Sequence, residues 1–141
     1  MNTLIAVLLI VHGLITSAQS AGSFSPGAGI PNPSWLSWWP TGLGQSWLFS
    51  RPGLEHSFLI PLGGLLYLVA GLALVAAGLG LLGWIVPTAW WPVLALVGAG
   101  LSLFMLLVYL HPFYLIGIAA SLAVLVSMLW VHWPSFMKMP V

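Results

Sequence analysis

The feature that most constrains this chain is a long stretch without a charged side chain, which runs from Ile60 to Trp133. A helix needs about 20 apolar residues to cross the hydrocarbon core of a bilayer, so this stretch can cross it three times. Pro87, Pro92 and Pro112 divide the stretch where helices are expected to begin or end. The stretch therefore predicts three membrane-spanning helices.

The composition of the whole chain also indicates a membrane protein. Of its 141 residues, 61% are hydrophobic and 2% are charged, whereas about 25% of the residues of a soluble domain are charged. The charged residues are Arg51, Glu55 and Lys138, so no basic patch is available for nucleic acid. The absence of cysteine excludes disulfides, thiolate metal sites and cysteine nucleophiles.

Residues 2–20 form a further apolar segment. Leu4 to Ile15 also fits the hydrophobic region of a signal peptide, with a small-residue cleavage site just after it. No Lys or Arg precedes the segment, so a retained transmembrane helix is the preferred interpretation. The sequence thus predicts an all-α, antiparallel, four-helix membrane bundle that forms one domain. Its helices are expected at about 2–20, 57–84, 90–111 and 112–133, with a long aromatic and Pro-rich loop at 21–56.

Polar and small residues in the first segment predict how it packs. His12, Thr16 and Gln19 share one helical face, which we expect to point into the bundle because lipid would penalise it. Gly13, Ser17 and Ala21 form a neighbouring row that would let another helix approach closely.

Two further rows of small residues, each with a spacing of seven, lie in the second helix. They predict close helix–helix packing, with a cofactor lying along the rows as the alternative. Helix four has a small row of its own at Ala119, Ala123 and Ser127. The rows of helix two are Gly63, Ala70 and Ala77, and Gly64, Gly71 and Gly78.

Tryptophans in the long loop predict a segment at the membrane surface or over the end of the bundle. Tryptophan prefers the headgroup zone, so anchoring is expected, and docking of a partner protein is the alternative. The loop residues concerned are Trp35, Trp38, Trp39 and Trp47. One interface of the bundle is expected to be marked by Trp84, Trp90, Trp91, Trp130 and Trp133, and the other by Phe58, Tyr109, Phe113 and Tyr114.

Few residues of the chain could take part in catalysis, proton transfer or metal binding. The helix order brings Arg51, Glu55, His56 and His111 to one interface, as an ion pair that closes the loop or as a proton relay or metal site. One acid and two histidines are few for a catalytic zinc ion. The chain has no aspartate, no phosphate-binding loop and no nucleophile elbow, so an enzyme is not expected.

An ionisable residue inside a membrane helix is a functional hypothesis by default, and His12 is such a residue. It could ligate a haem or chlorophyll, hydrogen-bond a quinone or carotenoid, or be neutral and bonded to a neighbouring helix. The candidate cofactor-binding residues are therefore His12, Thr16, Gln19 and His111.

Two short motifs carry a resemblance to a known group. Val11–Ile15 reads Val-His-Gly-Leu-Ile, and Leu110–Ile118 contains His111-Pro112. Together with the four-helix topology, they resemble the DoxX-like small bacterial membrane proteins. The resemblance implies a bacterial inner membrane protein and a partner of oxidoreductases. The acidic residue that such proteins often carry in helix four is replaced here by Ala119, Ala120 and Ser121.

The sequence therefore predicts a non-catalytic subunit that packs with lipids and with other integral membrane proteins in a larger, energy-transducing complex. A binder of a lipophilic cofactor and a DoxX-like redox partner are the alternatives. The placement of Lys138 mildly favours both termini in the cytoplasm.

Overall fold

The computed structural model describes residues 2–21, 46, 48 and 58–131. Over these residues the chain forms four α-helices and two short 3-10 helices, without a strand, so the all-α fold class is confirmed for this part. The helices are α1 (Asn2–Ala18), α3 (Leu59–Leu81), η2 (Thr88–Trp90), α4 (Trp91–Val108), η3 (Pro112–Tyr114) and α5 (Leu115–Leu129).

Three segments are long and apolar enough to cross a membrane. They are Pro61–Leu81, Thr88–Val108 and Pro112–Leu129. The fourth helix, α1, is also apolar but has only 17 residues. None of the described residues is Lys, Arg, Asp or Glu, because Arg51, Glu55 and Lys138 all lie outside them.

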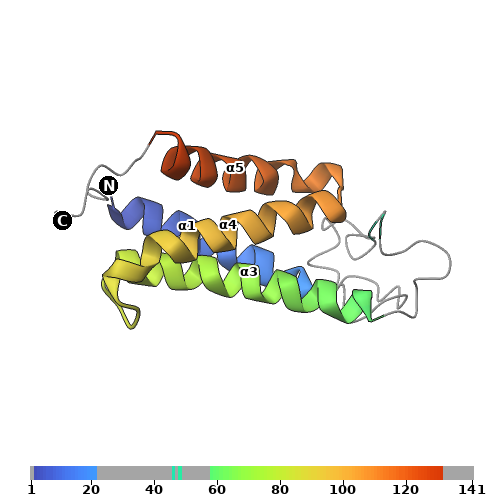
Figure 1. Ribbon diagram of the computed structural model, residues 1–141, viewed down its shortest axis with the longest axis horizontal. Coiled ribbons are helices and arrows are strands. Elements are labelled where there is room, and N and C mark those ends of the chain that lie inside the picture. Colours follow the sequence, from blue (N-terminus) through green and yellow to red (C-terminus); the bar gives the residue numbers. More distant parts are fainter. Residues whose placement is uncertain (1, 22–45, 47, 49–57, 132–141) are drawn as a thin grey trace, which may run out of the picture.

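The four helices lie side by side along the long axis of the molecule (Figure 1). The chain reverses direction between α3 and α4 and again between α4 and α5 (Figure 1). The extensive interfaces among the described helices are α1 with α3, α3 with α4 and α4 with α5. Thus α5 is held mainly by α4, and α1 mainly by α3.

Helix ends differ from the expected positions where backbone geometry intervenes. The α3 helix ends at Leu81, before the expected end near Trp84, and Gly83 follows in the left-handed region with φ 71°. The α4 helix ends at Val108 rather than at His111. His111 is extended, with φ −141° and ψ 144°, as proline requires of the residue before it.

The two small-residue rows of α3 face two different helices. A Cβ atom at Gly78 would lie 2.7 Å from the Ala6 carbonyl oxygen, so this row contacts α1. A Cβ atom at Gly98 of α4 would lie 3.1 Å from the Ala70 carbonyl oxygen, so the other row contacts α4. Gly64 is buried as well. Small residues on adjacent faces therefore let α3 approach two neighbours at once.

Ser17 lies in the tight interface between α1 and α3, and its Oγ is buried without a hydrogen-bond partner among the described residues. Leaving a buried polar atom unpaired costs about 1–3 kcal/mol. We therefore expect Ser17→Ala to leave thermal stability unchanged or to raise it, as measured by the melting temperature in mild detergent. A clear loss of stability would mean that the hydroxyl has a partner after all.

The interior is divided into two apolar clusters with polar residues between them. One cluster contains Leu9, Leu74, Trp91, Ala95 and Met128 among others. The other contains Tyr67, Met105, Leu106, Val108, Tyr109 and Tyr114. Along α4 the two clusters are separated by Ser102, which is fully buried.

Candidate functional site

Four polar residues from three helices meet between the two apolar clusters, and we call them the polar layer. His12 Nε2 lies 3.0 Å from Ser121 Oγ, and Ser121 donates to Ser102 Oγ at 3.2 Å. Ser102 Oγ lies 3.5 Å from Thr16 Oγ1, which donates to the His12 carbonyl oxygen at 2.8 Å. Both serines and Thr16 are buried, and each has a partner, as buried polar groups require.

The polar layer follows from one polar position on each of three helix faces. His12 and Thr16 are four residues apart in α1 and so lie on one face. Ser102 is the only hydroxyl-bearing residue of α4. Sequence reasoning missed Ser102 and Ser121 as partners of His12. A lone hydroxyl within an otherwise apolar helix was the available signal for Ser102.

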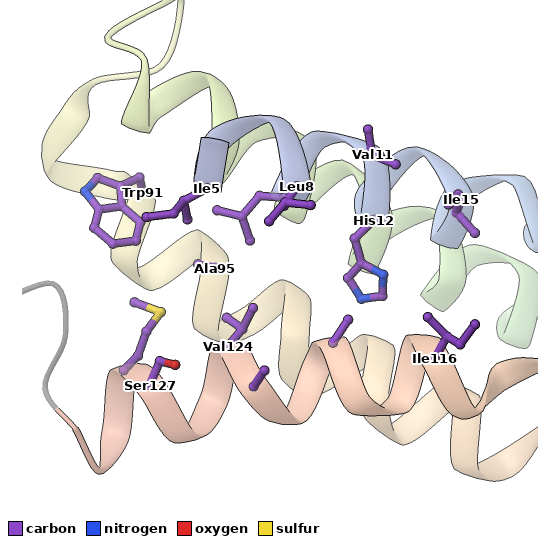
Figure 2. Close-up of a pocket in the computed structure, with 14 residues that line it drawn as sticks. Ile5, Leu8, Val11, His12, Ile15, Trp91, Ala95, Ile116, Val124 and Ser127 are labelled. Carbon is purple, nitrogen blue, oxygen red and sulfur yellow. The ribbon is translucent and has the colours of Figure 1, made fainter. Parts of the chain in front are cut away.

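A groove with a volume of about 430 Å³ lies between α1 and α5, beside the polar layer (Figure 2). Its walls come from α1 and α5, and Trp91 and Ala95 of α4 also line it. The α1 residues are Ile5, Leu8, Leu9, Val11, His12 and Ile15, and the α5 residues are Ile116, Ala120, Ala123, Val124, Ser127 and Met128.

Small side chains on α5 leave room for the groove. The groove is lined by Ala120, Ala123 and Ser127. The last two belong to the row of small residues that was expected to serve close helix packing. They instead face α1 across the groove, since α1 packs mainly on α3. Ala119 is exposed and does not line the groove.

His12 is the polar residue of the groove that also belongs to the polar layer. Its imidazole projects from α1 toward α5, between the Trp91 end of the groove and the end marked by Ile15 and Ile116 (Figure 2). The side chain is half-buried, so one part faces the groove while Nε2 contacts Ser121. The ring is therefore held in place by a neighbouring helix and is open to a ligand.

The other predicted cofactor-binding residues do not line the groove. Gln19 is buried, and its Oε1 accepts a hydrogen bond of 3.1 Å from the Tyr114 hydroxyl. Thr16 lies behind His12 in the polar layer. His111 is at the start of η3, where its Nδ1 accepts from the Phe113 backbone N–H at 3.1 Å. Of the four, His12 alone reaches the groove.

The predicted interface cluster cannot be followed beyond His111, because Arg51, Glu55 and His56 lie outside the described residues. The loop tryptophans Trp35, Trp38, Trp39 and Trp47 also lie outside them. Over the part of the chain that is described, no three His, Cys, Asp or Glu side chains come together as a metal site would need.

One described residue of the long loop covers the end of α4. Ser46 is buried, and its Oγ donates to the Val108 carbonyl oxygen at 2.8 Å. Val108 is the last residue of α4, where carbonyl groups lack partners within the helix. The loop thus supplies one hydrogen bond at this end of the bundle.

Aromatic residues differ between the two ends of the bundle. Trp84, Trp90 and Trp130 are exposed around the α3–α4 connection and the end of α5. Trp91 is buried in the cluster of Leu9, so the expectation that it marks this interface was wrong, and Trp133 lies outside the described residues. At the opposite end Tyr109 and Tyr114 are buried, so the expectation that they mark an interface was wrong. They pack in the cluster of Tyr67 instead, with the Tyr67 and Tyr109 ring centroids 5.2 Å apart.

No protein-family model, curated protein or solved structure matches this chain. The resemblance to DoxX-like proteins stays a prediction. Its motif residues have clear local roles here, since Gly13 packs against Gly71 of α3 and His111 begins η3.

Proposed function

We propose that this protein is an integral membrane protein whose four antiparallel helices hold a lipophilic ligand in the groove between α1 and α5. The observation that carries the proposal is an apolar groove with a positioned imidazole in its wall. An apolar pocket with a few convergent polar groups is the usual form of a small-molecule site.

Several features support placement in a membrane. Three helical segments are long and apolar enough to cross the bilayer, and the described residues carry no Lys, Arg, Asp or Glu. Trp84, Trp90 and Trp130 are exposed near one end, where aromatic residues would meet the headgroups. Although α1 is shorter, its exposed residues are mostly apolar. The bacterial inner membrane, with cytoplasmic termini, remains the proposed location.

The size and chemistry of the groove suit a ligand that is mostly hydrocarbon. A volume of about 430 Å³ falls within the roughly 300–1,000 Å³ typical of ligand pockets. Leu8, Val11, Ile15 and Ile116 are lining residues that are also exposed at the surface of the bundle. The groove therefore opens toward the surrounding lipid, from which a lipophilic molecule can enter.

Replacing Ala120 by phenylalanine tests this function. The larger side chain would fill the groove, so we expect Ala120→Phe to reduce the amount of co-purified lipophilic ligand by at least about tenfold, equivalent to about 1.4 kcal/mol of binding free energy. The protein is purified in mild detergent, and extracted small molecules are identified and quantified by mass spectrometry.

The matched control is Ala119→Phe, because Ala119 is exposed and lies next to Ala120 without lining the groove. This variant should retain the ligand at the wild-type level. Melting temperatures establish that both variants are folded. Equal amounts of ligand in the two variants, or no specific ligand in the wild type, would speak against the groove as a binding site.

A second function is favoured by the exposure of α5. Of the residues in the membrane-spanning window that includes α5, 17% are buried, against 44% in the windows of α3 and α4. A helix with so little internal packing suits an accessory subunit that presents α5 to another integral membrane protein. Purification from gentle detergent should then yield a fixed stoichiometry with that protein, and Val126→Trp, at an exposed α5 position, should break it.

A further inference from the structure

The hydrogen bonds of the polar layer have a direction that can be followed from atom to atom. The Thr16 hydroxyl donates its proton to the His12 carbonyl oxygen. The Thr16 and Ser102 oxygens lie 3.5 Å apart, and Ser102 can donate across this long contact because the Thr16 proton is already used. Ser121 donates to Ser102, so its proton is also used. The Thr16 and Ser121 protons therefore have defined acceptors, and the Ser102 proton is left for Thr16.

This direction favours one tautomer of His12. With Ser121 donating its proton to Ser102, Ser121 accepts from His12, and this arrangement places a hydrogen on Nε2. The groove is lined mostly by apolar side chains, which strongly disfavours a charged imidazolium. In the neutral ring, a proton on Nε2 leaves Nδ1 with a lone pair. The chain His12, Ser121, Ser102, Thr16 returns to the His12 carbonyl and closes on itself.

We infer that the groove selects lipophilic molecules that carry a hydroxyl group, and that Nδ1 of His12 accepts the hydrogen bond from that hydroxyl. This inference rests on the proposed function and names the ligand class of the same groove. A carbonyl or ether oxygen only accepts hydrogen bonds, so it gains nothing from Nδ1. An alcohol or a phenol such as a reduced quinone fits, whereas an oxidised quinone does not.

The position of His12 makes it the group that can orient such a ligand. The Nε2 side of the ring is committed to α5 through Ser121, and a Cβ atom at Gly117 would lie 3.8 Å from His12 Cε1. The ring is thus fixed between two helices before any ligand arrives. The remaining lining offers mainly hydrocarbon, with Ser127 placed further along α5.

The inference is tested by comparing two probes, all-trans-retinol and retinyl methyl ether, in which a methyl group replaces the hydroxyl proton. Binding to the full chain in nanodiscs is followed by retinoid fluorescence and by energy transfer from tryptophan. We expect the wild type to bind retinol roughly two- to tenfold more tightly than the ether, the effect of one hydrogen bond. In His12→Phe, which keeps an aromatic ring of similar shape, the two affinities should become equal.

The possible outcomes separate the inference from the proposed function. If neither probe binds in the groove, which Ala120→Phe would reveal, the proposed function fails and the inference falls with it. If both probes bind equally well, or the ether binds more tightly, the groove is a lipophile site but the hydroxyl selection is wrong.

Ser102→Ala provides a test at a distance from the ligand. It removes the acceptor of the Ser121 proton, so Ser121 becomes free to donate to Nε2 and His12 can carry its proton on Nδ1 instead. We expect the preference for retinol over the ether to shrink or reverse. Nitrogen-15 NMR of labelled histidine, assigned with His12→Phe, should show a bare Nδ1 in the wild type and a protonated Nδ1 in Ser102→Ala. A protonated Nδ1 in the wild type would overturn the inference.

Discussion

Replacing Gly71 by alanine is expected to destabilise the bundle severely. A Cβ atom at Gly71 would collide with Ser17 Oγ and with the backbone of Gly13 and Ser17. Backbone atoms cannot turn away as a side chain can, so α1 would have to move off α3. Overpacking of this kind typically costs about 1–3 kcal/mol and occasionally more. The melting temperature and the yield of folded protein in mild detergent should both fall.

Gly100→Ala is the matched control for this variant. Gly100 lies within α4, and a Cβ atom there would meet none of the described atoms within 4 Å. Alanine favours a helix interior over glycine by about 0.5–1 kcal/mol, so this variant should be as stable as the wild type or more so. If Gly71→Ala and Gly100→Ala proved equally stable, the tight α1–α3 contact would be contradicted.

Replacing Tyr67 by alanine is expected to have the other large effect. Tyr67 is 1% exposed, and its hydroxyl donates to the Met105 carbonyl oxygen at 3.3 Å. Removing the ring would leave a cavity in the cluster that joins α3, α4 and η3. Truncating a buried aromatic residue to alanine typically costs about 3–5 kcal/mol. Thermal unfolding in mild detergent measures the loss.

Phe104→Ala serves as the comparison, because Phe104 is also a large aromatic residue of the bundle but is 52% exposed. Its removal leaves no enclosed cavity, so the melting temperature should change much less. Tyr67→Phe keeps the ring and loses the hydroxyl, with its hydrogen bonds to the Met105 carbonyl and to Tyr114, so its loss of stability should fall between the two, at about 0.5–1.5 kcal/mol per hydrogen bond. Equal losses for Tyr67→Ala and Phe104→Ala would argue against the buried position of Tyr67.

Much of the helical organisation could be predicted from the sequence, because it depends on local rules. The uncharged stretch and its prolines gave the number of helices, and Pro112 forced the extended backbone of His111. The rows of small residues in α3 indicated close packing. They did not indicate which helix each row contacts, since that depends on how α3 is rotated between its neighbours.

Only part of the candidate site could be predicted from the sequence. His12 was recognisable because an ionisable residue is costly in an apolar helix. Its partner Ser121 lies 109 residues away in the chain, and no local pattern connects the two. The groove depends on α1 packing mainly on α3, which leaves the small side chains of α5 without a close neighbour. The burial of Tyr109 and Tyr114 could not be predicted either, because burial between helices depends on neighbouring helices and not on the sequence of one helix.

The opening of the groove between α1 and α5 also determines which ligand concentration governs the occupancy of the site. Residues such as Leu8 and Ile116 form its exposed rim, so in the proposed membrane setting the site exchanges with the bilayer and not with water. The quantity that governs occupancy is then the mole fraction of ligand among the lipids, and dilution with buffer leaves it unchanged. Adding empty lipid vesicles would empty the site, while a hundredfold larger aqueous volume would not.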